Sequence, residues 1–131
     1  MKTEEENYKR SISPVPRSNY NDLVNIYEFS IKLLSLRDPS QWLKQFFKGK
    51  GVSKLFCCGR SHIGGKIVSL ILDEIVCVNE QNSNPKECGA AFILNSDAAG
   101  IGYFSTRLKE QGVSAIYNLY DIRNELMRQN P

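Results

Sequence analysis

The stretch that decides the fold is Val52-Ser-Lys-Leu-Phe-Cys-Cys-Gly-Arg-Ser-His-Ile-Gly-Gly65. Its first half, residues 52–58, is short and apolar, which predicts a buried strand that ends at Gly59. The apolar residues 66–78 that follow are compatible with a buried helix, a strand, or a helix running into a strand, because periodicity does not separate these. The first feature that the sequence defines is therefore a buried strand with a glycine-containing polar turn at its end.

Two helices are predicted before this strand. From residue 21, apolar residues recur at three- and four-residue spacing, which predicts a helix with one apolar face. That face comprises Leu23, Ile26, Tyr27, Ile31 and Leu34. The second helix is expected to begin at Asp38, whose carboxylate can cap it, with Pro39 at the first position and Gln41 completing a capping box. Gly49 and Gly51 are expected to end it.

Strands and helices also alternate after residue 80. A polar loop at 81–87 precedes a strand at 90–94, a helix whose face carries Ile101, Phe104 and Leu108, a strand at 114–119 and a helix at 122–129. This alternation predicts a three-layer α/β fold with a mainly parallel central sheet flanked by helices. Ligand sites in such sheets lie where strands end and helices begin, so the turns at 59–65 and 95–101 are the candidate sites.

The length and composition predict one folded domain. Residues 1–20 are polar, charged and proline-containing, which predicts a flexible N-terminal arm ahead of a single α/β domain at 21–131. The longest apolar region is broken by Ser69, Asp73 and Glu74, so no membrane-spanning segment is expected. The N-terminus resembles neither a signal nor a transit peptide, which predicts a cytoplasmic protein, with the nucleus as the alternative.

Charge and residue counts limit the chemistry. The net charge is +3 and the basic residues are spread along the chain, which argues against a nucleic-acid binder. His62 is the single histidine, and the four cysteines form no C-x-x-C pair, so we expect no metal site. The cysteines are expected to be buried and reduced.

The C-terminal half resembles a known family. A strand at 91–94 leads into Asn95-Ser-Asp-Ala-Ala-Gly-Ile101, a helix that ends at Gly112 and a further strand. This order resembles the rhodanese-like domain, the fold of sulfurtransferases and of Cdc25-type phosphatases, in which a loop after a buried strand holds the catalytic cysteine and forms an anion cradle. The loop would here consist of Asn95, Ser96, Asp97, Ala98, Ala99, Gly100 and Ile101.

The central stretch adds to this resemblance. Arg60, His62-Ile63 and Gly65 are similar to the family's strand end and to its His-Ile-x-Gly-Ala segment. Cys58 stands where the family has an acid, and Lys66 replaces its alanine. The resemblance covers about residues 53–129 and implies that His62-Ile63 lies in a loop with a structural role.

The resemblance implies a module without catalysis. Asn95 occupies the position of the nucleophilic cysteine, and an amide neither attacks nor ionises, so sulfurtransferase and phosphatase activity should be absent. Asp97 would repel an anion, and Ser96 is expected to cap a helix. Cys58 could be activated by His62, but we expect it to be a buried side chain of a strand. The resemblance therefore implies a regulatory or docking module that binds another protein or an attached domain, without a cofactor.

A second hypothesis rests on the same central stretch. Gly59-Arg-Ser-His-Ile-Gly64 is a dinucleotide-binding fingerprint in which Ser61 replaces the second glycine, and Glu80 lies near the position of the acid that binds a ribose hydroxyl. This pattern predicts a Rossmann-like domain that binds a nucleotide or a nucleotide sugar, weakened by Ser61. It requires a helix that begins within residues 62–65 and a strand that ends near Glu80, whereas the family resemblance requires a loop at His62.

Overall fold

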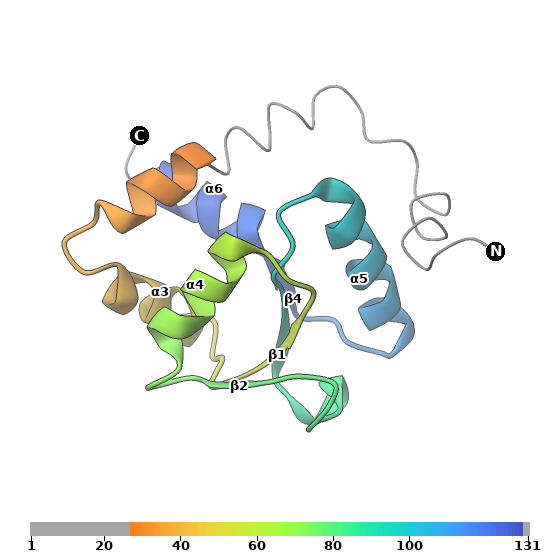
Figure 1. The fold of residues 1–131 in the computed structure, drawn as a ribbon. Helices are drawn as coiled ribbons and strands as arrows, with labels where there is room; N and C mark the ends of the chain where they lie inside the picture. Colours follow the sequence, from red (N-terminus) through yellow and green to blue (C-terminus); the bar gives the residue numbers. More distant parts are fainter. Residues whose placement is uncertain (1–26, 130–131) are drawn as a thin grey trace.

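Four parallel strands form one sheet in residues 27–129, the part of the chain that the computed structural model describes (Figure 1). The strand order is β2-β1-β3-β4. The strands are β1 (Lys54–Cys58), β2 (Val76–Val78), β3 (Ala90–Ile93) and β4 (Ile116–Asn118). The register pairs Leu55 of β1 with Cys77 on one side and with Ala90 on the other. Every neighbouring pair is parallel, which confirms the predicted sheet.

Helices make the connections that parallel strands need. Helix α4 (His62–Ile71) joins β1 to β2, and α5 (Ala98–Glu110) joins β3 to β4. A short 3₁₀ helix, η1 (Pro85–Glu87), lies between β2 and β3, and α6 (Leu119–Gln129) follows β4. Ahead of the sheet, residues 27–34 are helical and α3 (Pro39–Lys48) follows them.

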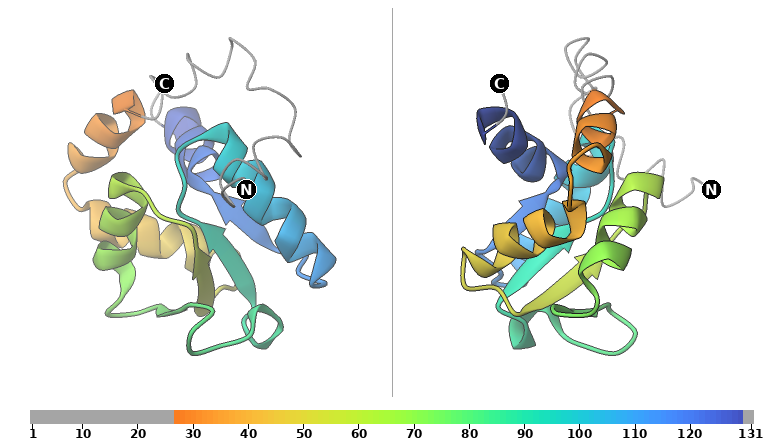
Figure 2. Two further views of the ribbon diagram at one scale, coloured as in Figure 1. Left: turned by 45° about the vertical axis from the view of Figure 1, so that its right-hand side comes forward. Right: turned by 90° about the vertical axis from the view of Figure 1, so that its left-hand side faces the viewer.

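The helices cover both faces of the sheet, so the fold has three layers (Figure 2). Strand side chains alternate between the faces. Leu55 and Phe92 belong to the core beneath helix 27–34, α3, α4 and α6. Phe56 and Ile93 belong to a second core, which also contains Leu108 of α5. The predicted three-layer α/β fold is confirmed.

Helix α3 begins and ends as the sequence predicts. The Asp38 side chain accepts a hydrogen bond from the backbone N–H of Gln41 at 3.0 Å, and Pro39 is the first helical residue. The N–H of Gly49 still donates to Gln45, and Gly51 adopts a φ of 78°, which turns the chain toward β1. Local capping chemistry therefore sets both ends of this helix.

The apolar segment 66–78 is a helix followed by a strand. Helix α4 begins at His62 and extends to Ile71, and β2 begins at Val76. Ile67 and Ile71 are fully buried in the core. The tertiary packing thus decides between the three structures that the apolar pattern left open.

The predicted apolar face of the first helix is wrong. Phe29 and Leu33 are fully buried, whereas Tyr27, Ile31 and Leu34 are 75%, 70% and 44% exposed. The helix has apolar residues on two sides, and the side that carries Phe29 and Leu33 packs against the core. Burying Phe29 leaves no polar atom unpaired, whereas burying Tyr27 would require a partner for its hydroxyl. Leu23, Ile26 and the predicted arm at 1–20 lie outside the described residues.

Candidate functional site

The strands β1 and β3 are neighbours whose following helices leave on opposite faces of the sheet. Helix α4 packs with the core that contains Leu55, and α5 packs with the core that contains Phe56. The chain therefore diverges at the carboxyl ends of these two strands, which is where α/β proteins form a binding crevice. Both candidate turns from the sequence meet here.

Gly59 allows the turn after β1 to pass close to the turn after β3. Its φ is 75°, a conformation that side-chain-bearing residues rarely adopt. A Cβ atom at this position would lie 1.7 Å from Oδ1 of Asn95. Only glycine fits here without a rearrangement, and a tight turn of this kind is what the first glycine of a dinucleotide-binding fingerprint provides.

Ser61 connects the same two turns through hydrogen bonds. Its hydroxyl accepts from the N–H of Gly64 at 2.9 Å, which caps α4, and donates to the carbonyl oxygen of Leu94. A ligand phosphate in a dinucleotide-binding turn would use such an N–H group. The serine hydroxyl therefore occupies one of the positions where an oxyanion would bind.

Gly64 brings the first turn of α4 against the end of β3. A Cβ atom on Gly64 would lie 2.4 Å from the carbonyl oxygen of Leu94 and 2.7 Å from its Cβ atom. The third glycine of a dinucleotide-binding fingerprint serves this close packing of helix on strand. In contrast, a Cβ atom on Gly65 would have no neighbour within 4 Å.

The predicted loop at 95–101 is shorter than expected. Helix α5 begins at Ala98, so Ala98, Ala99, Gly100 and Ile101 are helical rather than part of a cradle. Asp97 caps this helix by accepting from the N–H of Gly100 at 2.7 Å. The expected cap, Ser96, does not have this role; its carbonyl oxygen accepts from the Tyr120 hydroxyl at 3.4 Å. The Asp97 carboxylate thus lies at the start of α5, where an anion cradle was expected.

The Asn95 side chain lies between the turn after β1 and the start of α5. Its Nδ2 atom donates to Asp97 at 3.3 Å, whereas its Oδ1 atom is buried and has no hydrogen-bond partner within the described part of the chain. Buried amide oxygens normally have a partner. Asn95 is therefore positioned to accept a hydrogen bond, and it has no nucleophilic atom.

His62 and Ile63 lie in α4 and not in a loop. His62 is the first residue of this helix, which contradicts the loop that the family resemblance implies. The reason is local, because Ser61 caps the helix directly ahead of His62. The helix start at His62 and the end of β2 at Val78, two residues before Glu80, match the requirements of the Rossmann-like hypothesis.

Two cavities lie on either side of the β1–α4 turn. The first, which we call the Glu80 cavity, measures about 400 Å³ and is bounded by the turn, by the segment after β2 and by α5. Its lining residues are Cys57, Cys58, Gly59, Arg60, Asn79, Glu80, Gln81, Asn95 and Phe104. The structure thus brings together Gly59, Glu80 and Asn95, which three separate segments provide.

The second cavity, which we call the Lys66 cavity, measures about 590 Å³ and lies at the start of α4. It is lined by Tyr27, Ser30, Leu34, Arg60, Ser61, His62, Ile63, Lys66 and Ser96. Arg60 borders both cavities. Sequence reasoning missed Asn79, Phe104 and Tyr27; only the position of Asn79 directly after a strand could have indicated it.

Cys58 is not an activated thiol. Burial and, less strongly, the charge of Glu80 raise its pKa to about 12, and Arg107 opposes this rise. The thiol is therefore protonated at neutral pH and is a poor nucleophile. His62 does not line the Glu80 cavity with it; the two residues border different cavities.

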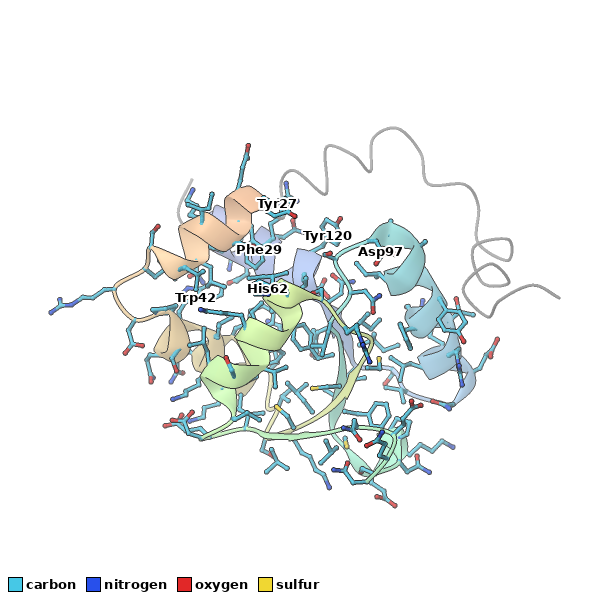
Figure 3. The ribbon with its side chains drawn as sticks, in the orientation of Figure 1. Tyr27, Phe29, Trp42, His62, Asp97 and Tyr120 are labelled. Carbon is cyan, nitrogen blue, oxygen red and sulfur yellow. The ribbon has the colours of Figure 1, made fainter. Side chains whose placement is uncertain are left out.

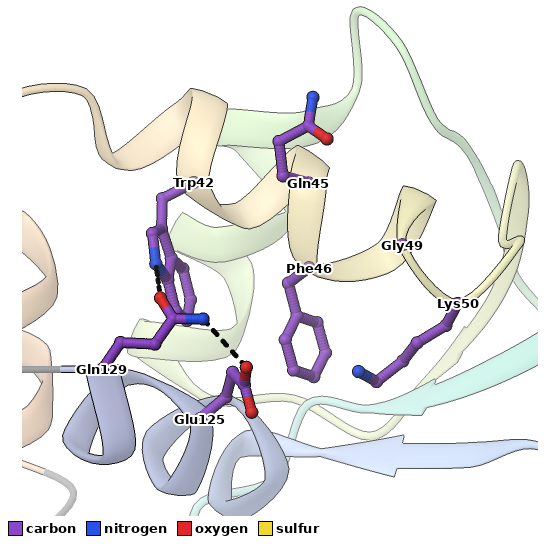
Figure 4. A pocket seen from close by; sticks show the side chains of 7 residues that line it. All are labelled: Trp42, Gln45, Phe46, Gly49, Lys50, Glu125 and Gln129. Atoms are coloured by element: carbon purple, nitrogen blue, oxygen red, sulfur yellow. Dashed lines mark hydrogen bonds between the residues drawn. The ribbon is translucent and has the colours of Figure 1, made fainter.

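A separate hollow of about 350 Å³ lies between α3 and α6 (Figure 4). The indole N–H of Trp42 donates to Gln129 at 2.8 Å, and Gln129 donates to Glu125 at 2.8 Å. The Lys50 ammonium lies 4.2 Å from the centre of the Phe46 ring. These polar groups already have partners within the protein, and the bond from Trp42 to Gln129 links α3 to α6. We therefore assign no ligand to this hollow.

Within residues 27–129, no group of three or more histidine, cysteine, aspartate or glutamate side chains could hold a metal ion. None of the helices described there is long and apolar enough to cross a membrane. Comparisons of the chain with family models, with curated proteins and with solved structures find no match. The resemblance to rhodanese-like domains and the docking role that it implies stay predictions.

Proposed function

We propose that this chain is a binding module for a nucleoside phosphate, held at the carboxyl ends of β1 and β3. The observation that supports this most is the Glu80 cavity, where Gly59, Glu80 and Asn95 face one space of about 400 Å³. A turn with a left-handed glycine, a capped helix after it and an acid after the next strand are the parts of a dinucleotide-binding half.

Glu80 and Asn95 supply the polar groups for a nucleoside. An exposed carboxylate at the end of the second strand accepts hydrogen bonds from ribose hydroxyls in such sites. The Asn95 side chain adds polar surface to the lining of this cavity. Phe104 adds an aromatic surface to the wall formed by α5. This combination suits a sugar and a base better than it suits an apolar ligand.

Arg60 supplies the charge for the phosphate. Its guanidinium is exposed, and it makes no ion pair in the described range 27–129. A guanidinium binds phosphate oxygens through two parallel hydrogen bonds. The first N–H groups of α4, at His62 and Ile63, have no acceptor within the helix and add partial positive charge. Since Ser61 already takes the N–H of Gly64, we expect weaker binding than in a site with three free N–H groups.

The proposed role is binding without catalysis. Asn95 has no nucleophilic atom, and Cys58 is protonated at neutral pH because of its raised pKa. This binding role shares the lack of catalysis with the protein-docking role that the family resemblance implies. It differs in its ligand, which is a small molecule.

Isothermal titration with ADP, UDP and GDP tests this proposal. At least one of them should bind, and Glu80→Gln should weaken binding by about tenfold or more, because a hydrogen bond to a charged group contributes about 1.5–3 kcal/mol. Glu110→Gln is the matched control, since Glu110 is exposed at the end of α5 and borders neither cavity. The absence of heat and of a thermal shift with all three nucleotides at about 5 mM would refute the proposal, because a bound ligand must stabilise the fold.

A further inference from the structure

The Lys66 cavity adjoins the same turn but lies outside the Glu80 cavity, in which we place the nucleoside. Gly59 and Asn95 line the Glu80 cavity, while Ser61, two residues after Gly59, and Ser96, directly after Asn95, line the Lys66 cavity. The two spaces are therefore separated by the thickness of the two turns, and Arg60 borders both. A molecule bound at Arg60 can extend into either space.

Arg60 and Lys66 give the Lys66 cavity a positively charged wall at the start of α4. Arg60, His62 and Lys66 are exposed, and none of their side chains has an ion pair or hydrogen bond within the part of the chain that the structure describes. His62 and Lys66 are four residues apart on α4 and so lie on the same side of it. Among residues 27–129, no acidic side chain lines this cavity. Its charge therefore favours an anionic ligand or one rich in hydrogen-bond acceptors.

The opposite wall is formed by helix 27–34 and is amphipathic. Tyr27 is 75% exposed and Leu34 is 44% exposed. Figure 3 shows Tyr27 and His62 at the same end of the molecule as Asp97 and Tyr120. Ser61 and Ser96 also border the space. An aromatic ring beside hydroxyl and cationic groups suits a polar ring such as a sugar.

We propose that the ligand is a nucleoside diphosphate ester whose terminal phosphate carries a second ring-bearing group, and that this group occupies the Lys66 cavity. This inference rests on the proposed function, because the nucleoside occupies the Glu80 cavity. The diphosphate lies at Arg60, between the two spaces. The shared chemistry is the diphosphate with a ring on each end, and a hexose or a second nucleoside can supply the second ring.

Titration of matched pairs tests the inference. The probes are ADP, UDP and GDP, their hexose esters ADP-glucose, UDP-glucose and GDP-mannose, and NAD as the dinucleotide. In the series whose diphosphate binds, an ester or NAD should bind about tenfold more tightly than the diphosphate. If a hexose ester binds more tightly than NAD, the second ring is a hexose, and if NAD binds more tightly, it is a nucleoside.

Two variants locate the second group. Lys66→Gln should reduce the ratio of the diphosphate's dissociation constant to that of the ester to about threefold or less. It should change the dissociation constant of the diphosphate itself by no more than about twofold. Leu34→Trp fills the cavity from an exposed position and should have the same effect. Lys109→Gln, an equal charge change at an exposed position of α5, should alter neither ligand. Circular dichroism and urea midpoints establish that each variant is folded.

The outcomes separate the two proposals. Equal affinity for a diphosphate and its esters overturns the second-cavity inference and leaves the proposed function standing. An ester advantage that survives both Lys66→Gln and Leu34→Trp also overturns the inference, because the second group then binds elsewhere. Binding of no nucleotide or ester overturns both proposals.

Discussion

The Ser61 hydroxyl donates a hydrogen bond to the carbonyl oxygen of Leu94, and this bond joins the turn after β1 to the turn after β3. The same hydroxyl caps α4 through the N–H of Gly64. One side chain thus fixes the start of a helix and the separation of two turns that border both cavities.

Ser61→Ala should destabilise the fold by about 1–3 kcal/mol, because it removes a helix cap and leaves the Leu94 carbonyl without this donor. Urea unfolding measures the change. Ser69→Ala is the matched control, since the Ser69 hydroxyl bonds only within α4 on the exposed surface, and it should change stability by less than about 0.5 kcal/mol. Equal effects of the two variants would contradict the role given to Ser61.

Substitution by alanine should change the stability of the fold in opposite directions at two adjacent glycines. Gly64→Ala places a methyl group 2.4 Å from the Leu94 carbonyl oxygen and should destabilise the fold by about 1–3 kcal/mol. Gly65→Ala meets open space inside a helix and should stabilise it by about 0.5–1 kcal/mol. Thermal and urea unfolding of both variants check this pair, and stabilisation by Gly64→Ala would show that α4 does not pack so closely on β3.

The Lys44–Asp73 ion pair should make stability depend on pH in the acid range. Lys44 is buried, and its ammonium lies 2.7 Å from the Asp73 carboxylate, whose pKa is lowered mainly by this hydrogen bond. The folded pKa thus lies below the unfolded value of about 3.9, so the stabilisation is present above about pH 4 and is lost as the pH falls through the lowered value.

Asp73→Asn should therefore be less stable than the unmodified chain at pH 7, and the difference should shrink as the pH falls below about 4 and through the lowered pKa of Asp73. Urea unfolding at a series of pH values measures it. Glu74→Gln is the control, because its partner Lys48 is exposed and such pairs contribute little. A difference between Asp73→Asn and the unmodified chain that does not change with pH would exclude the carboxylate as its source.

Neither the unmodified chain nor Asn95→Cys should catalyse sulfur transfer from thiosulfate to cyanide. A cysteine at position 95 would lie beside the Asp97 carboxylate, which accepts from the Asn95 side chain at 3.3 Å and already holds the N–H of Gly100. A neighbouring negative charge disfavours the thiolate. The double variant Asn95→Cys with Asp97→Asn removes this charge. Sulfur transfer by the double variant alone would assign the inactivity of Asn95→Cys to the charge and not to the loss of the cradle. Robust turnover by the unmodified chain would refute the prediction that it is inactive.

Much of the fold could be predicted from the sequence because its signals are local. Asp38, Pro39 and Gln41 define the start of α3 without reference to the rest of the chain. The order of short apolar strands and amphipathic helices predicts the parallel sheet. The face of helix 27–34 could not be predicted, because Phe29 and Leu33 compete with Tyr27 and Ile31, and only the packed core decides between them.

The site was predictable in part for the same reason. The fingerprint spacing pairs Gly59 with Glu80, and the structure places both residues on the lining of one cavity. The extent of the loop after β3 was wrong, because both Ser96 and Asp97 can cap a helix and sequence does not show which one does so. The contribution of Tyr27 depends on a tertiary contact that no local pattern encodes.

Ser61 also acts as an internal competitor for any anion at the start of α4. An incoming phosphate that takes the N–H of Gly64 must displace the serine hydroxyl, which then also becomes free to leave the Leu94 carbonyl. Loading of the site would thereby exchange a bond within the protein for a bond to the ligand. The two turns, which the free chain holds together by itself, would then be held together by the bound molecule.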